Sequence, residues 1–278
     1  MTHQTVRNGI IGVGLFCIIS LAFAPWSAGQ AAHEPIPMQA WVHDPILASV
    51  QISPDGRHIV AVSPQDLEAV PQLTIWDVEN LGAPPRRIDL VAGNRSRWKP
   101  VAAAWLNNEQ IYVVGQQLLD VRVSGRTILT FNTKAFVYHM GRDRLAEPFG
   151  GGGTRLQDLV GQTALVDRMP MDDDRVLVSQ TTPEGATNLY EMRLDRNYTT
   201  RRIFRGAPGA SAFPDWDGNV RGRVRFEDRG GARLEVDVRP VDANEWQTIA
   251  QFLASDREGL QPIGFARDPD VFFMTDNG

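Results

Sequence analysis

Short apolar runs separated by turn residues fill the chain after residue 40. The runs are rich in β-branched and aromatic side chains, which is typical of strands. They are Ile59–Val62, Leu73–Trp76, Ile111–Val114, Ala135–Tyr138, Val176–Val178, Leu189–Met192, Val220–Phe226, Leu234–Val238 and Val271–Met274. No long amphipathic pattern predicts a helix here, and residues 243–254 fit better as a strand with Trp246 and Phe252 on its flanks. The pattern predicts an all-β domain.

Turn residues punctuate these runs. Ser53-Pro-Asp-Gly56 is a β-turn sequence, because proline fixes φ at its second position and glycine tolerates the fourth. Asp217-Gly-Asn219 and Arg229-Gly-Gly231 supply residues for tight hairpins. Gly150–Gly153 is a four-glycine stretch without a following Lys-Ser/Thr, so a connecting loop is expected there and not a phosphate cradle.

A weak repeat connects these signals. Equivalent turn-then-strand points recur at Ile52, Trp105, Met171, Trp216 and Phe265. A unit of roughly 40 to 50 residues with four strands is the size of a propeller blade. The first unit reads as strands at 50–52, 59–62, 73–78 and 87–90. We therefore predict a β-propeller over residues 32–278 with WD40-like or TolB-like blades.

The predicted blades number about four and a half, and the last is cut at Gly278. One interpretation is an incomplete seven- or eight-bladed propeller, because a closed ring needs its last blade to meet the first and a cut blade exposes strand edges. The alternative is a short, self-closing propeller of four or five blades.

The first 31 residues predict a signal peptide, which forms an N-terminal helix. Arg7 precedes an uncharged run, Ile10–Ala24, that would span roughly 22 Å as a helix, short of the roughly 30 Å core of a bilayer. Cleavage is expected before Ala32, with a cut after Ala24 or an uncleaved anchor as alternatives. The prediction is a periplasmic or secreted protein with no membrane segment after cleavage.

Cysteine and charge narrow the function classes. Cys17 is the one cysteine, and Phe16 before it argues against lipidation. The mature chain would have neither disulfides nor a thiol nucleophile. The net charge is −5 and no Lys/Arg block stands out, so a nucleic acid partner is not expected.

Candidate chemical sites are sparse. Asp172–Asp174 and the Asp215-x-Asp217-Gly218-Asn219 stretch offer oxygen ligands for a cation, but the second lacks the glutamate of a calcium loop, because Phe226 occupies that position. Both are interpreted as solvated turns. The histidines lack metal spacing: His3, His33, His43, His58 and His139. The prediction is no metal-binding, cofactor-binding or catalytic residue in this chain and no cofactor.

Two further motifs have alternative interpretations. Five tryptophans either pack between blades, the favoured interpretation, or line a binding surface: Trp76, Trp98, Trp105, Trp216 and Trp246. Asn94-Arg-Ser96 and Asn197-Tyr-Thr199 are glycosylation sequons, which matter only in a eukaryotic source.

Several stretches resemble the N-terminal propeller of the prolyl oligopeptidase (S9) family of serine peptidases, which includes acylaminoacyl peptidases. They are Val50–Val62, Asp215–Arg225, Glu245–Gln247, Pro262–Asp268 and Phe272–Gly278, within residues 40–278. SPDG turns also occur in periplasmic TolB-like propellers. The resemblance implies a propeller capping an α/β-hydrolase domain, whose Ser, Asp and His would follow residue 278. The chain has no Glu-Glu pair, which speaks against the family's dipeptidyl peptidase branch.

No catalytic residue of that family maps onto this chain. Gly209-Ala-Ser211-Ala-Phe213 lacks the second glycine of a nucleophile elbow and lies between strands. The first functional hypothesis is a non-catalytic propeller of an exported serine peptidase, which restricts peptide access to a hydrolase domain and is inactive alone. The alternative is a stand-alone periplasmic TolB-like propeller that binds a protein or peptide without catalysis.

Overall fold

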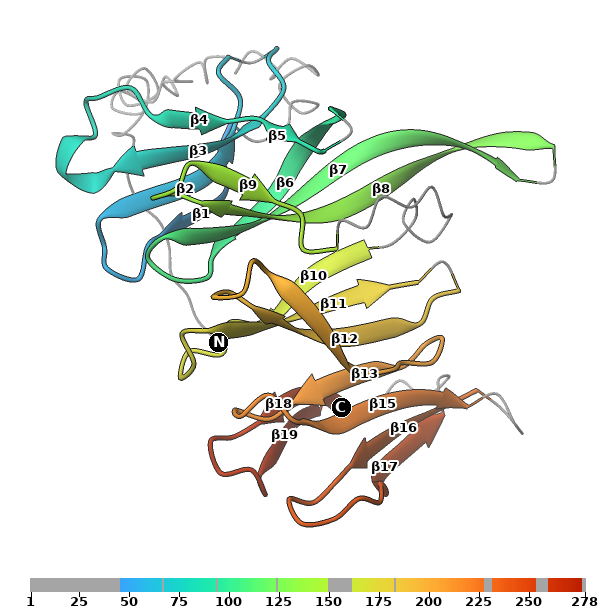
Figure 1. The fold of residues 1–278 in the computed structure, drawn as a ribbon. Coiled ribbons are helices and arrows are strands. Elements are labelled where there is room, and N and C mark those ends of the chain that lie inside the picture. Colours follow the sequence, from blue (N-terminus) through green and yellow to red (C-terminus); the bar gives the residue numbers. More distant parts are fainter. Residues whose placement is uncertain are drawn as a thin grey trace, which may run out of the picture. The chain divides into compact units, whose positions relative to one another are not determined.

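Antiparallel strands make up nearly all the regular structure in the computed structural model (Figure 1), which describes residues 46–276 except 67, 94, 124, 150–161, 183, 228–231 and 254–259. The predicted signal helix over residues 1–31, with Cys17, lies outside the described residues, as do Gly150–Gly153 and Asn94. Among the described residues, no helix is long and apolar enough to cross a membrane.

The strands form five sheets in chain order, and within each sheet every strand pairs with the next one along the chain. The first sheet contains β1 (Ala48–Ile52), β2 (His58–Ser63), β3 (Gln72–Asp77) and β4 (Arg86–Ile88), with a 3-10 turn at Val78–Asn80. The second contains β5 (Leu90–Val91), β6 (Arg97–Trp105), β7 (Gln110–Val123), β8 (Arg126–His139) and β9 (Arg144–Ala146).

The remaining sheets repeat this up-and-down order. The third contains β10 (Gln162–Asp167), β11 (Arg175–Thr181), β12 (Thr187–Arg193) and β13 (Thr199–Phe204). The fourth contains β14 (Ser211–Pro214), β15 (Val220–Glu227), β16 (Arg233–Val238) and β17 (Gln247–Leu253), and the fifth pairs β18 (Leu260–Phe265) with β19 (Phe272–Asp276). Consecutive four-stranded antiparallel units are the blades of a propeller, so the predicted fold class is confirmed.

Two details differ from the prediction. The strand expected at 87–90 is divided, because β4 completes the first sheet while β5 begins the second. Leu90 is the residue that crosses, and it is buried among the side chains that join the two sheets. The second sheet has five strands, and β7 and β8 are each 14 residues long. Their outer halves mix polar and apolar residues without the unbroken apolar runs of the inner halves, so the hydrophobic pattern did not indicate this length.

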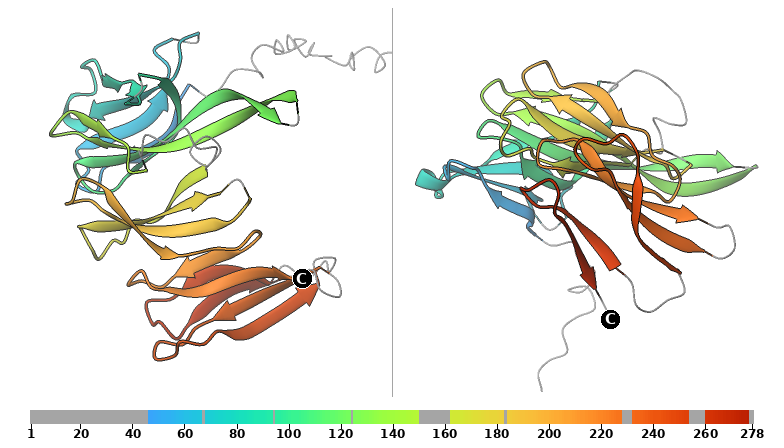
Figure 2. Two further views of the ribbon diagram at one scale, coloured as in Figure 1. Left: turned by 45° about the vertical axis from the view of Figure 1, so that its right-hand side comes forward. Right: turned by 90° about the horizontal axis from the view of Figure 1, so that it is seen from below.

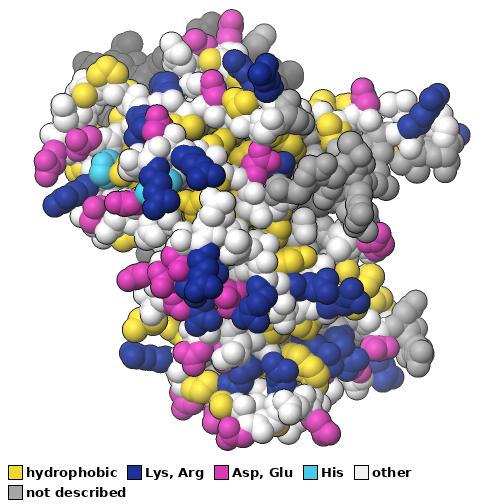
Figure 3. Space-filling model, in the orientation of Figure 1, with side chains coloured by type: hydrophobic (Ala, Val, Ile, Leu, Met, Phe, Trp, Pro, Cys, Tyr) yellow, Lys and Arg dark blue, Asp and Glu magenta, His cyan; other side chains and the backbone are white. Residues whose placement is uncertain are grey.

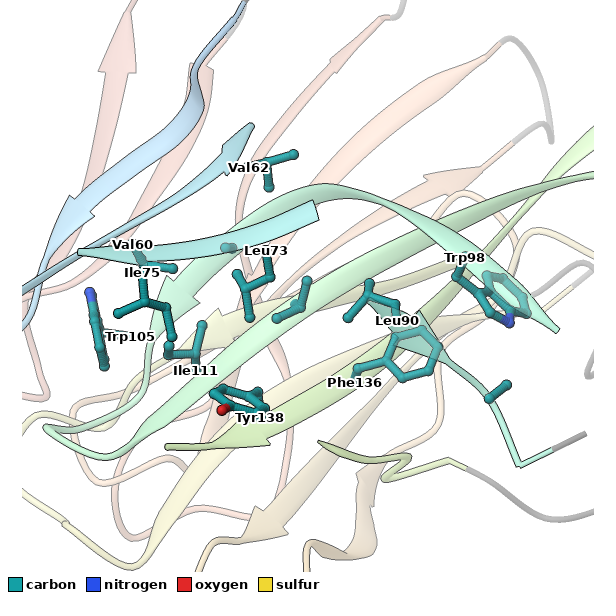
Figure 4. Close-up of a cluster of buried hydrophobic side chains, with 13 residues drawn as sticks. Val60, Val62, Leu73, Ile75, Leu90, Trp98, Trp105, Ile111, Phe136 and Tyr138 are labelled. Carbon is teal, nitrogen blue, oxygen red and sulfur yellow. The ribbon is translucent and has the colours of Figure 1, made fainter. Parts of the chain in front are cut away.

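The second sheet is buried on both faces at its base. Ile111 and Val113 of β7, with Phe136 and Tyr138 of β8, pack against the first sheet (Figure 4). The residues between them face the other way, where Tyr112, Ala135 and Val137 join side chains of β11 and β12. This double burial explains why the sequence reads as the unbroken runs Ile111–Val114 and Ala135–Tyr138 and does not alternate.

Close backbone approach joins the fourth and fifth sheets. Gly222 of β15 lies where a Cβ atom would meet Phe213 at 3.1 Å and both Phe265 and Phe272 at 3.2 Å. The Phe265 and Phe272 rings are 4.7 Å apart, and Phe213 meets Phe272 edge-on at 6.0 Å. Glycine is therefore favoured here by the tight space and not by backbone conformation.

Candidate binding surface

Five hairpin loops occupy equivalent places in the five sheets. They comprise residues 53–57, 106–109, 168–174, 215–219 and 266–271, and they follow β1, β6, β10, β14 and β18. We call them the entry loops. These are the repeat points that the sequence predicted at Ile52, Trp105, Met171, Trp216 and Phe265, so that equivalence is confirmed.

Backbone and side-chain hydrogen bonds hold the entry loops closed. The N–H of Ser53 donates to the carbonyl of His58, that of Asp215 to Asn219, and that of Ala266 to Val271, each at 2.8 Å. Asp215 Oδ1 also accepts from the N–H groups of Asp217 at 3.0 Å and Asn219 at 2.8 Å. Such turns hold their exposed side chains in fixed positions.

Contacts run between entry loops that are neighbours in chain order. The Asp55 N–H donates to Asn108 Oδ1 at 3.0 Å, connecting the loops of the first two sheets. Arg175 of β11 donates to the Asp217 carbonyl at 3.3 Å, which ties the third sheet to the loop of the fourth. The Trp216 indole N–H donates to the Phe265 carbonyl at 3.0 Å and reaches the fifth sheet. These contacts join the loops of the first two sheets and, separately, connect the third, fourth and fifth sheets at this end.

The tryptophans divide between packing and exposure. Trp98 and Trp105 are buried, and the Trp246 ring lies 4.3 Å from the Arg223 guanidinium and 5.2 Å from that of Arg239. The interpretation of packing between blades holds for Trp98 and Trp105, whereas both arginines beside Trp246 belong to its own sheet. Trp216 differs, because it remains 46% exposed although its indole N–H is fixed by Phe265.

A hollow of about 220 Å³ lies beside Trp216. Its lining comes from three entry loops: Met171, Asp215, Trp216, Asp217, Arg267 and Pro269. Trp216, Met171 and Pro269 provide apolar surface, and Met171 is 74% exposed. Asp217 and Arg267 add one exposed charge of each sign. The arrangement suits an amphipathic side chain together with the polar backbone of a peptide.

A larger hollow of about 440 Å³ lies at the other end of the third sheet. Its lining is drawn from β11 to β13 and their connections and includes Glu184, Asn188, Arg202 and Arg205. It is built from one sheet and lacks an exposed aromatic platform, whereas the hollow at Trp216 gathers residues from three sheets. We therefore take the entry-loop hollow as the candidate site.

The groups that resemble catalytic residues serve structural roles. Ser53 Oγ donates to Asp55 at 2.6 Å and accepts from the backbone N–H of His58 at 2.9 Å, so its proton points to a carboxylate and not to an imidazole. This hydrogen bond lowers the pKa of Asp55. His139 is buried, with Nε2 at 3.5 Å from Glu109. Ser211 is the first residue of β14 and follows a connection between two strands, whereas the serine of a nucleophile elbow lies in a turn between a strand and a helix.

In each acidic stretch the carboxylate of the first aspartate already accepts hydrogen bonds. Asp172 accepts from the guanidinium of Arg175, which lowers the pKa of this carboxyl, and also from the Asp174 N–H at 3.0 Å. The Asp215 oxygens receive the backbone groups of its own loop. In the described part of the chain, no group of three or more His, Cys, Asp or Glu side chains is placed to hold a metal ion.

Sequence reasoning named Trp216 but missed Met171, Arg267 and Pro269 as its neighbours. The available signal was the repeat itself, because equivalent loops of adjacent blades must meet at one end of the sheets. A large apolar side chain within the polar turn Pro214–Asn219 was a second signal. Asn197, of the second sequon, lies exposed in the turn between β12 and β13 with φ of 55°.

No model of a known protein family matches the chain, and no curated protein matches it. Among solved structures, it is similar to an acylaminoacyl peptidase in complex with Z-Gly-Gly-Phe-chloromethyl ketone, at 12% identity and a TM-score of 0.41, over 79% of this chain and 34% of that one. A structure from a study of two prolyl endopeptidases gives 13% identity and a TM-score of 0.44, over 83% of this chain and 31% of that one.

TolB from Acinetobacter baumannii is similar at 11% identity and a TM-score of 0.34, over 79% of this chain and 49% of TolB. The chain thus spans about a third to a half of the length of these three proteins.

Proposed function

We propose that this chain is a non-catalytic propeller that binds an extended peptide segment at the entry-loop hollow. The observation that carries the proposal is Trp216, half exposed and held by its hydrogen bond to Phe265. A large aromatic side chain that is already fixed loses little conformational entropy on binding, and such residues dominate the energetics of binding surfaces.

The chemistry around Trp216 favours a peptide over a small metabolite. A hollow of about 220 Å³ is smaller than the usual drug-sized site but accommodates one large side chain. Asp217 and Arg267 line the hollow and would bind the amide groups or charges of the flanking peptide. The adjoining hollow of about 320 Å³ shares Asp215, Asp217 and Pro269 and would receive a neighbouring residue.

For the whole protein, the first candidate is an exported serine peptidase of the prolyl oligopeptidase type that contains this propeller. The propeller would restrict the access of peptides to a hydrolase domain elsewhere in the full protein. The blade sequences that resemble this family support this candidate, and the Ser53 hydroxyl is held by Asp55 and by the backbone N–H of His58, which fits a propeller without a nucleophile. In this setting the protein acts in the periplasm or outside the cell.

The second candidate is a stand-alone TolB-like binding module in the periplasm. The exposure of Met171 and Trp216 favours it, because a docked hydrolase domain is not needed to complete the hollow. Both candidates share peptide binding without catalysis in this chain and differ in what the complete gene product does.

Peptide binding is tested with a random-sequence peptide array, followed by fluorescence anisotropy on the best binder. Trp216→Ala should weaken its affinity about thirtyfold, equivalent to about 2 kcal/mol for an aromatic anchor. Phe226→Ala is the matched control, because Phe226 is also 46% exposed but lies on β15 outside the hollow. Equal affinities for Trp216→Ala and the parent chain would exclude this site.

A fluorophosphonate probe separates the two candidates. We expect this chain to remain unlabelled under either of them. The complete gene product should be labelled and should cleave peptides if the propeller belongs to a serine peptidase. A complete product that binds peptides without labelling would support the stand-alone module and exclude the peptidase.

A further inference from the structure

The outer halves of β7 and β8 form a two-stranded arm. The two strands pair without interruption from Gln110 opposite His139 to Val123 opposite Arg126. β6 pairs with β7 only as far as Gln116, and β9 pairs with β8 only from Val137. In the described residues, therefore, no strand covers the outer edge of β7 beyond Gln116. Figures 1 and 2 show the arm extending past the rest of its sheet.

The arm exposes apolar side chains that a free hairpin would not be expected to carry. Leu118 and Phe131 are directly opposite each other and 49% and 59% exposed. Leu129 shares their face and is 60% exposed, while Ile128 on the other face is 49% exposed. Figure 3 shows apolar and charged side chains together on this projection. An isolated two-stranded ribbon is only marginally stable, and an uncovered edge is a template for another strand.

We infer that the β7 edge of the arm pairs with the β7 edge of a second copy of this chain, in antiparallel order about a two-fold axis through Val121. Such an interface is isologous, so the edge must be complementary to itself. The result is a four-stranded sheet in which each two-stranded arm gains a neighbour.

The charge pattern selects this register. Opposite residues in an antiparallel pair share a face, so a two-fold axis perpendicular to the sheet passes through a residue. An axis through Asp120 would oppose two aspartates, and one through Arg122 would oppose two arginines. An axis through Val121 opposes Asp120 to Arg122 of the partner twice and Leu119 to Val123 twice. Opposite charges facing each other stabilise a pair of strands, and like charges destabilise it.

A second copy explains the edge better than an arbitrary peptide strand. A peptide would need only the backbone of β7 and would place no demand on the order of Asp120 and Arg122. Both side chains are exposed on the arm, and both lie on the face that carries Leu118, Leu129 and Phe131. The joined sheet therefore places apolar groups from both copies on one face, flanking a central pair of ion pairs.

Sedimentation velocity over a range of protein concentrations tests the pairing. The parent chain should dimerise reversibly, and Asp120→Arg or Arg122→Asp alone should each weaken the dimer by about tenfold or more. The double variant carrying both reversals should restore the parental affinity, because each opposed pair is again of opposite sign. Arg126→Asp is the matched control, since Arg126 lies at the same tip but on β8.

Cysteine crosslinking tests the axis independently of charge. Cys17→Ser leaves no native cysteine, so Val121→Cys in that background supplies a single thiol per chain. Opposite Cα atoms in antiparallel strands are roughly 4.5 to 5.5 Å apart, within the range for a disulfide. Val121→Cys should give an oxidised dimer, whereas Thr127→Cys on β8 should not, because two further strands would separate the thiols.

Four outcomes would overturn the inference. They are a monomeric parent chain at every soluble concentration, failure of the double reversal to restore the dimer, an equal loss with Arg126→Asp, and crosslinking of Thr127→Cys as efficient as that of Val121→Cys. Circular dichroism of each variant verifies the fold, and the arm's distance from the buried base of the sheet keeps these substitutions away from the core.

Discussion

Asp237 is a buried carboxylate next to the last residue of β16, with its side chain only 1% exposed. It accepts from Arg223 at 2.8 Å, from Arg225 at 2.6 Å and from the Thr248 hydroxyl at 2.8 Å. Burial alone raises the pKa of Asp237, but the hydrogen bonds from Arg225, Arg223 and Thr248 outweigh it, and the net pKa is lowered. We predict that Asp237→Asn and Asp237→Ala destabilise the fold by different amounts.

The expected loss of folding free energy depends on the groups that donate hydrogen bonds to Asp237. Asparagine keeps the shape, but it is neutral and has one acceptor oxygen where aspartate has two, so the ion pairs with Arg223 and Arg225 become weaker hydrogen bonds from a guanidinium to an amide. Hydrogen bonds to charged groups are worth about 1.5–3 kcal/mol each, so weakening two of them should cost about 2–3 kcal/mol in all. Water reaches both guanidinium groups, which are 24% and 31% exposed, and Arg225 retains Glu227 and Glu235. Because water and these glutamates compensate part of the loss, the destabilisation lies at the lower end of this range, and Asp237→Asn should cost about 2 kcal/mol. Alanine also removes the acceptor from Thr248, and its cost should approach about 4 kcal/mol.

Urea denaturation followed by circular dichroism measures both losses, with Asp173→Asn as the control, because Asp173 is exposed in its turn. The pH dependence provides a second readout. Since the folded pKa of Asp237 is lowered, its stabilisation is present above the unfolded value of about 3.9 and is lost as pH falls through the folded value. The difference between the parent chain and Asp237→Asn should be constant from neutral pH to about pH 4 and shrink below it.

The reasoning about Asp237 fails if Asp237→Ala costs no more than Asp173→Asn. It also fails if the difference between parent and Asp237→Asn grows as the pH falls from neutral towards about 4, because that is the behaviour of a carboxyl whose pKa is raised on folding.

Two further predictions concern packing. Gly222→Ala should destabilise the fold by about 1–3 kcal/mol in urea, because its Cβ meets three phenylalanines, whereas Gly82→Ala has no heavy atom within 4 Å and should change stability by less than about 0.5 kcal/mol. Phe136→Ala should cost about 3–5 kcal/mol, because Phe136 is fully buried and meets Trp98 edge-on at 5.9 Å, and Val70→Ala, at a 68% exposed side chain, provides its control in thermal unfolding. An equal effect for either pair would contradict the packing described for that site.

The strands were predictable because buried strands need apolar side chains, which form recognisable runs in the sequence. Ile111–Val114 and Ala135–Tyr138 lie between two sheets, so every residue there is apolar or aromatic, and the runs stand out. The turns were predictable because proline and glycine have few alternatives at tight corners. The outer half of β7 was not predictable from hydrophobicity, since strand pairing there depends on backbone hydrogen bonds and not on a buried side chain.

The candidate site was predictable only in part. Trp216 was named as a candidate because exposed tryptophans often line binding surfaces. Its local sequence, however, contains no information on Arg267 and Pro269, which are about fifty residues away. Their meeting depends on the fourth and fifth sheets packing face to face through Gly222. A contact of that kind arises from the assembled fold, so the repeat spacing could indicate the region but not the chemistry.

The double burial of the second sheet has a consequence for how the chain unfolds. Contacts pass mainly between neighbouring sheets, so stability approximates a sum of units and the interfaces between them. The second sheet contributes to two such interfaces, through Ile111 and Val113 on one face and Tyr112 and Val137 on the other. We therefore expect amide protons at the base of β7 and β8 to exchange slowly with solvent, because both interfaces must open to expose this sheet.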